Sequence, residues 1–120
     1  MKFAIKKLDP ALLPRMARVL KAVGHPLRLQ LLERLAAGEC SVQELVKELR
    51  RPQAIVSQHL KVMRNGGVVV HRREGTRVIY ALAHDGLVSL LSCLATCQSH
   101  CLAPDGNLSP PPERPAGSST

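Results

Sequence analysis

The stretch SVQELVKELRRPQAIVSQHLKVMRNGG, residues 41–67, decides the fold of this chain. Ser41 and Glu44 have the spacing of a capping box, which predicts that a helix begins at this point. Pro52 ends this helix early and suits the first turn of the next one. Asn65 and the glycines that follow it end the second helix. The stretch therefore predicts two short helices separated by a turn that contains proline.

Two further helices are predicted upstream of this stretch. Residues 9–24 and 25–39 place apolar side chains at helical spacing, and Gly24 and Gly38 lie at their ends. The helix in residues 25–39 has Pro26 in its first turn, where the missing N–H costs nothing. The apolar stripes expected to face the core are Leu27, Leu31, Leu32 and Leu35 upstream, and Val56, Leu60 and Met63 in the later helix.

The periodicity changes downstream of residue 67. VVVHRREGTRVIYAL, residues 68–82, holds two β-rich runs around a Glu-Gly pair, which predicts a hairpin. Residues 85–102 then return to helical spacing, with Leu87, Leu91 and Leu94 expected on the buried face. The predicted fold class is mainly α with a small β-hairpin.

Composition fits one small helical domain. The chain has 120 residues, of which 45% are hydrophobic but only 2% aromatic, so we expect a core of Leu, Val and Ala. Residues 1–102 are the predicted domain, and residues 103–120, rich in proline, are a predicted disordered tail. No apolar run approaches the ~18 residues that span a bilayer, and the N-terminus lacks the apolar segment of a signal peptide. We therefore expect a cytoplasmic protein that does not bind membranes.

The distribution of charge indicates a polyanionic partner. The formal net charge is +8, and residues 50–77 alone hold seven Lys or Arg and one acid. On a helical wheel, residues 53–65 turn an acid-free face of Ser, Gln, Lys and Asn away from the core, which suits the major groove of DNA. The hairpin tip carries three arginines that can reach phosphates. A merely solvated surface is the alternative, but these features together favour nucleic-acid binding.

Residues 20–82 resemble the winged helix-turn-helix core of the ArsR/SmtB repressors, the bacterial arsenical- and metal-responsive repressors. The segments HPLRLQLLERL, SVQEL and VSQHLKVMRNGGVVVHRREG match that family in order and spacing. The resemblance implies a homodimer, with the first and last helices paired across it, that binds double-stranded operator DNA and leaves it when an inducer binds. A two-fold protein is expected to select an inverted repeat.

The resemblance also assigns the DNA-binding residues. The recognition helix corresponds to residues 53–64 and the wing to residues 72–77. The candidate DNA-binding residues are Gln53, Ala54, Ser57, Gln58, Lys61, Arg64, Arg72, Arg73 and Arg77.

Neither of the family's inducer sites is complete in this chain. The arsenic- and cadmium-sensing members carry Cys-Val-Cys where this chain has Cys40 alone, with Val42 two positions along. The zinc-sensing members carry an Asp-x-His and His-x-x-Glu set on the last helix. Asp85 and His100 match that set, but Leu87 and Ala103 occupy the other two positions.

Three cysteines instead follow one another at four-residue spacing near the C-terminus, at Cys93, Cys97 and Cys101. Cys93 and Cys101 lie ~12 Å apart along an intact helix, whereas thiolates on one tetrahedral ion lie under ~5 Å apart. One site would therefore use two of these thiols with a further ligand, for which Cys40 and His100 are candidates, or the helix end would unwind. We expect no permanently bound cofactor.

The inducer most favoured by the resemblance and by soft thiolate ligands is trivalent arsenic or antimony. Divalent Zn or Cd, or Cu(I), comes second, and reactive sulfur or an oxidant acting on the same cysteines comes third. Three alternatives stay open. The cysteines only pack at the dimer seam, the protein binds DNA constitutively, or Cys97 and His100 form the nucleophile and base of a small thiol enzyme.

Overall fold

The computed structural model describes residues 6–100, with the side chains of Ser99 and His100 left out. The predicted tail, residues 103–120, lies outside the described residues, and so does Cys101. The helices and strands follow the predicted order with one addition. They are η1 (Pro10–Leu12), α1 (Leu13–Val23), α2 (Pro26–Ala36), β1 (Cys40–Ser41), α3 (Val42–Leu49), α4 (Gln53–Asn65), β2 (Val69–Glu74), β3 (Arg77–Leu82) and α5 (Gly86–His100).

Short-range contacts set the ends of the helices. The Oγ of Ser41 accepts a hydrogen bond from the N–H of Glu44, 3.1 Å away, so α3 is capped as predicted. The Nδ1 of His25 accepts from the N–H of Leu27 at 3.0 Å and caps α2 in the same way. Arg50 ends α3 in the left-handed conformation with φ of 54°, which allows the sharp turn into α4.

The added element is β1, which turns the hairpin into a three-stranded sheet. Its order is β1-β3-β2, with Cys40 opposite Tyr80 and Ser41 opposite Ile79. A strand of two residues shows no alternation of apolar and polar side chains, so no sequence pattern predicts it. The sheet joins the hairpin to the connection between α2 and α3.

The core lies among α2, α3, α4 and the base of the sheet. Leu31, Leu32, Leu45, Leu60 and Met63 are fully buried, which confirms the predicted stripes. The end of α4 also meets α1 closely, because a Cβ added at Gly66 would lie 2.4 Å from the Cβ of Ala22.

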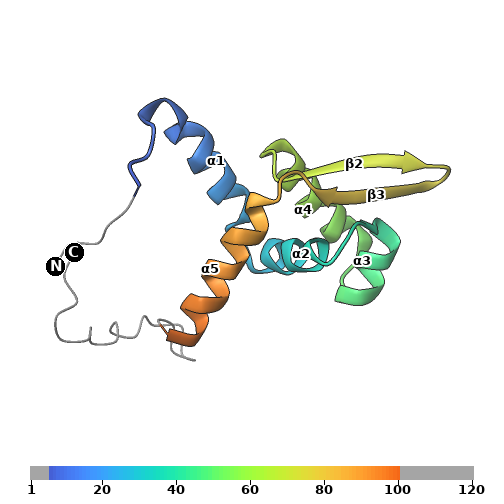
Figure 1. The fold of residues 1–120 in the computed structure, drawn as a ribbon. Helices are drawn as coiled ribbons and strands as arrows, with labels where there is room; N and C mark the ends of the chain where they lie inside the picture. The colour runs from blue at the N-terminus through green and yellow to red at the C-terminus, as the bar shows by residue number, and fades with distance from the viewer. Residues whose placement is uncertain (1–5, 101–120) are drawn as a thin grey trace.

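Several elements leave large apolar side chains in solvent. On η1, α1 and α5 these are Leu12, Leu13, Leu20, Val88 and Leu94, and elsewhere they are Leu8, Ile55, Val62 and Val70. On α5 the expected buried face is only partly correct, since Leu87 is buried, Leu91 is half-buried and Leu94 is 40% exposed. α1 and α5 lie on one side of the molecule and the β2–β3 hairpin projects from the other (Figure 1). None of the described helices is long and apolar enough to span a membrane.

Candidate nucleic-acid interface

The face of α4 that the sequence predicted for DNA is exposed. Val56, Leu60 and Met63 are fully buried on the opposite side and hold the helix against the core. Gln53, Ala54, Gln58 and Lys61 are exposed, while Ser57 and Arg64 are half-buried. No side chain caps the start of α4, so its first N–H groups are suited to a phosphate. These residues form a polar, acid-free face on one rigid helix.

A cleft of about 260 Å³ separates this face from the hairpin. Its walls come from α3, α4, β2, β3 and the hairpin turn. The lining residues are Val42, Gln43, Gln53, Ser57, Arg64, His71, Thr76, Val78 and Tyr80. Arg64 Nη1 of α4 lies 3.1 Å from Nε2 of His71 in β2, so the two sides are joined by a polar contact. The His71 ring also packs against the ring of Tyr80, tilted by 33° with centroids 5.4 Å apart. Sequence reasoning missed Gln43, His71 and Thr76 as cleft residues, because only the fold brings them beside α4.

The two faces of the hairpin differ. In the register, His71 is opposite Tyr80, Arg72 opposite Ile79, and Arg73 opposite Val78. Because side chains alternate along a strand, Arg73 shares the face of His71, Val78 and Tyr80 that lines the cleft, and Arg72 lies on the other face.

The predicted wing arginines are not equally available. Arg72 forms ion pairs with Glu39 at 2.7 Å and with Glu74 at 2.9 Å. Arg77 forms an ion pair with Glu44. The ion pairs at the wing therefore join two arginines to three glutamates, so the carboxylates offset all of this paired positive charge. The excess of positive charge counted along residues 50–77 missed Glu39 and Glu44, which lie outside that segment.

These contacts shift the acidity of the groups involved. Hydrogen bonds from Arg72 hold the pKa of Glu39 below its usual range, and the two carboxylates raise the pKa of Arg72. The S–H of Cys40 donates to Oε2 of Glu44 at 3.3 Å, and this bond, followed by that from Arg77, lowers the pKa of Glu44. Burial, with the bond to Glu44, raises the pKa of Cys40 to about 11. Cys40 is therefore a protonated thiol at neutral pH and a weak nucleophile.

The cysteines lie in different environments. Cys40 is buried beside α3, while Cys93 is exposed and Cys97 half-buried on α5. Within residues 6–98, whose side chains are described, no three His, Cys, Asp or Glu side chains form a group that could hold a metal ion. Cys40 therefore does not join Cys93 and Cys97 in such a group. The side chain of His100 and all of Cys101 lie outside the described residues.

Known proteins share this arrangement. The sequence pattern of the family described as "Bacterial regulatory protein, arsR family" matches residues 25–70. The biofilm growth-associated repressor of Agrobacterium fabrum is 44% identical over 78 residues, which are 65% of this chain and 67% of that protein. The chain belongs to the ArsR family. The HTH-type transcriptional repressor SmtB of Mycobacterium tuberculosis is 38% identical over 73 residues, which are 61% of this chain and 54% of SmtB.

The ArsR fold is also confirmed by solved structures. The homodimeric winged helix-turn-helix DNA-binding domain of Mb0332 from Mycobacterium bovis has a TM-score of 0.68 and 32% identity, covering 79% of this chain and 91% of that one. As an ArsR-family member the protein is a DNA-binding transcriptional regulator and not an enzyme. The small thiol enzyme considered from Cys97 and His100 is therefore set aside.

Proposed function

We propose that this ArsR-family protein is a homodimeric repressor that binds an inverted repeat in operator DNA and leaves it when an inducer reacts with thiols of α5. The observation that carries the DNA-binding part is the exposed, acid-free face of α4 beside the cleft and the wing. On that face Gln58 can form paired hydrogen bonds with adenine, and Lys61 can bind guanine or a phosphate. Ser57, half-buried at the cleft wall, can bind a base or a phosphate.

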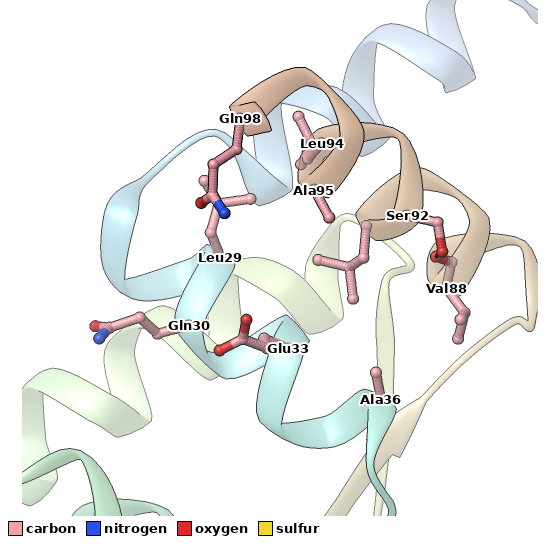
Figure 2. A pocket seen from close by; sticks show the side chains of 10 residues that line it. Leu29, Gln30, Glu33, Ala36, Val88, Ser92, Leu94, Ala95 and Gln98 are labelled. Atoms are coloured by element: carbon pink, nitrogen blue, oxygen red, sulfur yellow. Dashed lines mark hydrogen bonds between the residues drawn. The ribbon is translucent and has the colours of Figure 1, made fainter. Parts of the chain in front are cut away.

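The proposed dimer uses the side of the molecule that carries α1 and α5. A groove of about 450 Å³ runs between α2 and α5, and Leu29, Val88 and Leu94 supply much of its apolar lining (Figure 2). Covering it and the exposed leucines of α1 with a second copy would remove apolar surface from water. The hairpin projects from the other side (Figure 1). The exposed face of α4 in each protomer of the proposed dimer therefore stays free for DNA. The homodimeric state of the similar Mb0332 domain supports a dimer.

The proposed inducer site is built on α5. Cys93 is exposed and Cys97 half-buried, four residues apart on one helix next to the proposed seam. The proposed ligands are Cys97, either Cys93 or Cys101, and His100. Their thiolates are soft ligands, so we favour arsenite or antimonite as the inducer. Zn or Cd is the second candidate, and reactive sulfur or an oxidant is the third. Drawing these thiols together at the seam changes the angle between the two α4 helices, so operator affinity falls by linkage. Residues 103–120 are proposed to be a tail that neither process needs.

Operator binding is tested by anisotropy of a labelled inverted repeat against scrambled DNA, with sedimentation to measure the dimer. Gln58→Ala is expected to lose about tenfold or more of the preference for the operator, since a paired base contact is worth ~1–3 kcal/mol. Glu48→Gln, an exposed change on α3 outside the lining of both the cleft and the groove, is the control and should bind as the wild type does. A monomer, or equal preference in both variants, contradicts the proposal.

Release is tested by titrating the reduced protein on its operator with arsenite, Cd, Zn and persulfide. Cys97→Ser should keep the fold and operator binding but abolish release by arsenite, because serine is a poor soft-metal ligand. Cys40→Ser is the control and should be released normally. Release by arsenite in Cys97→Ser contradicts the site. Release by persulfide alone, with a Cys–Cys bridge detected by mass spectrometry, would mean that the protein senses redox state rather than metal. No release by any of the four compounds would mean that it binds DNA constitutively.

A further inference from the structure

The guanidinium of Arg72 is the most heavily paired cation among the described residues. Its Nη1 and Nη2 donate to the two carboxylate oxygens of Glu39, both at 2.7 Å, in the parallel two-bond geometry that is strongest for this pair. Its Nε and Nη2 also donate to Oε1 of Glu74 at 3.1 and 2.9 Å. All three nitrogens of Arg72 are therefore already bonded to carboxylates.

The group formed by Glu39, Arg72 and Glu74 has a formal charge of −1. A DNA phosphate approaching it would meet a net negative charge and would have to displace two carboxylates from one guanidinium. The contact would then exchange one ion pair for another and gain little. Arg72 is thus poorly placed to contribute to the electrostatic binding of DNA.

The same ion pairs have a mechanical consequence. Arg72 lies on β2, one edge of the sheet, and Glu39 directly precedes β1, the other edge. The Arg72–Glu39 pair therefore crosses the central strand β3 and joins the hairpin to the connection between α2 and α3. It adds a side-chain tie to a hairpin that β1 holds through two residues only.

Arg73 has the opposite character. It is exposed, it lies on the cleft-lining face with His71 and Val78, and among residues 6–98 no carboxylate pairs with it. We propose that Glu39, Arg72 and Glu74 form a clamp in which Arg72 is a positioning residue rather than a DNA contact, and that the clamp fixes the wing so that Arg73 makes its phosphate contact. This inference rests on the proposed function.

The test is a salt series of DNA affinity, read as the slope of log K against log salt. Arg73→Ala should lower the slope by ~0.9, the loss of one phosphate contact, and weaken binding to every sequence. Arg73→Lys keeps the charge and should keep the slope. Arg72→Glu should weaken binding, because it puts a third carboxylate beside Glu39 and Glu74 and leaves no cation between them. The exchange Glu39→Arg/Arg72→Glu leaves net charge unchanged and can rebuild the clamp, so it should restore wild-type affinity and slope.

Two results would overturn the inference. If the exchange binds as weakly as Arg72→Glu alone while its circular dichroism and melting match the wild type, Arg72 contacts DNA. If Arg73→Ala leaves the slope unaltered, the wing contact is elsewhere. A melting-temperature cycle of Glu39→Gln, Arg72→Gln and the double variant should show coupling, and additive effects would mean that no clamp exists. If the wild-type protein shows no salt-dependent DNA binding, the proposed function is wrong. The melting-temperature cycle would still show whether Glu39 and Arg72 are coupled.

Discussion

The recognition helix α4 and the wing look alike in sequence and differ in the folded chain. Both are basic, yet α4 keeps an acid-free exposed face, whereas the wing arginines Arg72 and Arg77 are paired with glutamates. The reason is the origin of their neighbours. On a helix the neighbours are three and four residues away, so the sequence displays them. On a hairpin they come from other elements, and Glu39 and Glu44 are each 33 residues from the arginine they bind.

The largest effect is expected from placing an acid on α4. Gln58→Glu changes one amide into a carboxylate of the same shape on an exposed position, so the fold should be kept. Operator affinity should fall by about tenfold to a hundredfold, because a base contact of ~1–3 kcal/mol is lost and the carboxylate repels the phosphates. Thr76→Glu at the hairpin tip is the comparison and should cost less, since the wing already holds three acids. Equal losses, measured by anisotropy, would show that the two regions do not differ.

The second prediction removes an acid from the wing. Glu44→Gln leaves Arg77 without its carboxylate, so the salt slope of DNA binding should steepen by up to ~0.9 and affinity should rise severalfold. The cap of α3 is kept, because it uses the backbone N–H of Glu44. Glu48→Gln, on the same helix but paired with Arg34, is the control and should leave the slope unchanged. An unchanged slope for Glu44→Gln as well would mean that Arg77 does not reach phosphate.

A smaller effect is expected from the pH dependence of the clamp. The pKa of Glu39 is lowered in the folded chain, so its contribution to stability is present above the ordinary glutamate pKa of about 4.5 and is lost as pH falls through the lowered value. Glu39→Gln should therefore melt at a lower temperature than the wild type at pH 7, and the two melting temperatures should converge as pH falls below the lowered pKa of Glu39. A difference in melting temperature that persists or grows in acid would contradict this.

The smallest effect is expected at Cys40, which lies behind Glu44 rather than at the surface. Cys40→Ser keeps a donor to Glu44, so operator affinity should change by less than about twofold. In the native wild-type protein at pH 8, Cys40 should resist alkylation, because it is buried and its pKa is about 11, whereas the exposed Cys93 should react. Peptide mass analysis would show which cysteines are modified. Rapid modification of Cys40 would mean that the contact between β1 and β3 opens and exposes its thiol.

The sequence by itself determined most of the local structure. Capping at Ser41, the turn at Pro52 and the glycines after Asn65 predicted α3 and α4 within a residue or two, because such signals act between near neighbours. The spacing of Leu31, Leu32, Leu60 and Met63 also predicted which sides are buried. The exposed face of α4 followed from the same periodicity, since a helix that buries one side must present the other.

Tertiary structure alone decided the strand β1, the pairing of Arg72 and Arg77 with distant glutamates, and the exposure of Leu20 and Leu94. Among the described side chains it also leaves Cys40, Cys93 and Cys97 without a shared group of three metal ligands, which the sequence had allowed. These features depend on which residues meet across the fold. A two-residue strand and a side-chain ion pair involve too few residues to produce a periodic sequence pattern. An apolar helix face has the same sequence pattern whether its own chain buries it or leaves it exposed.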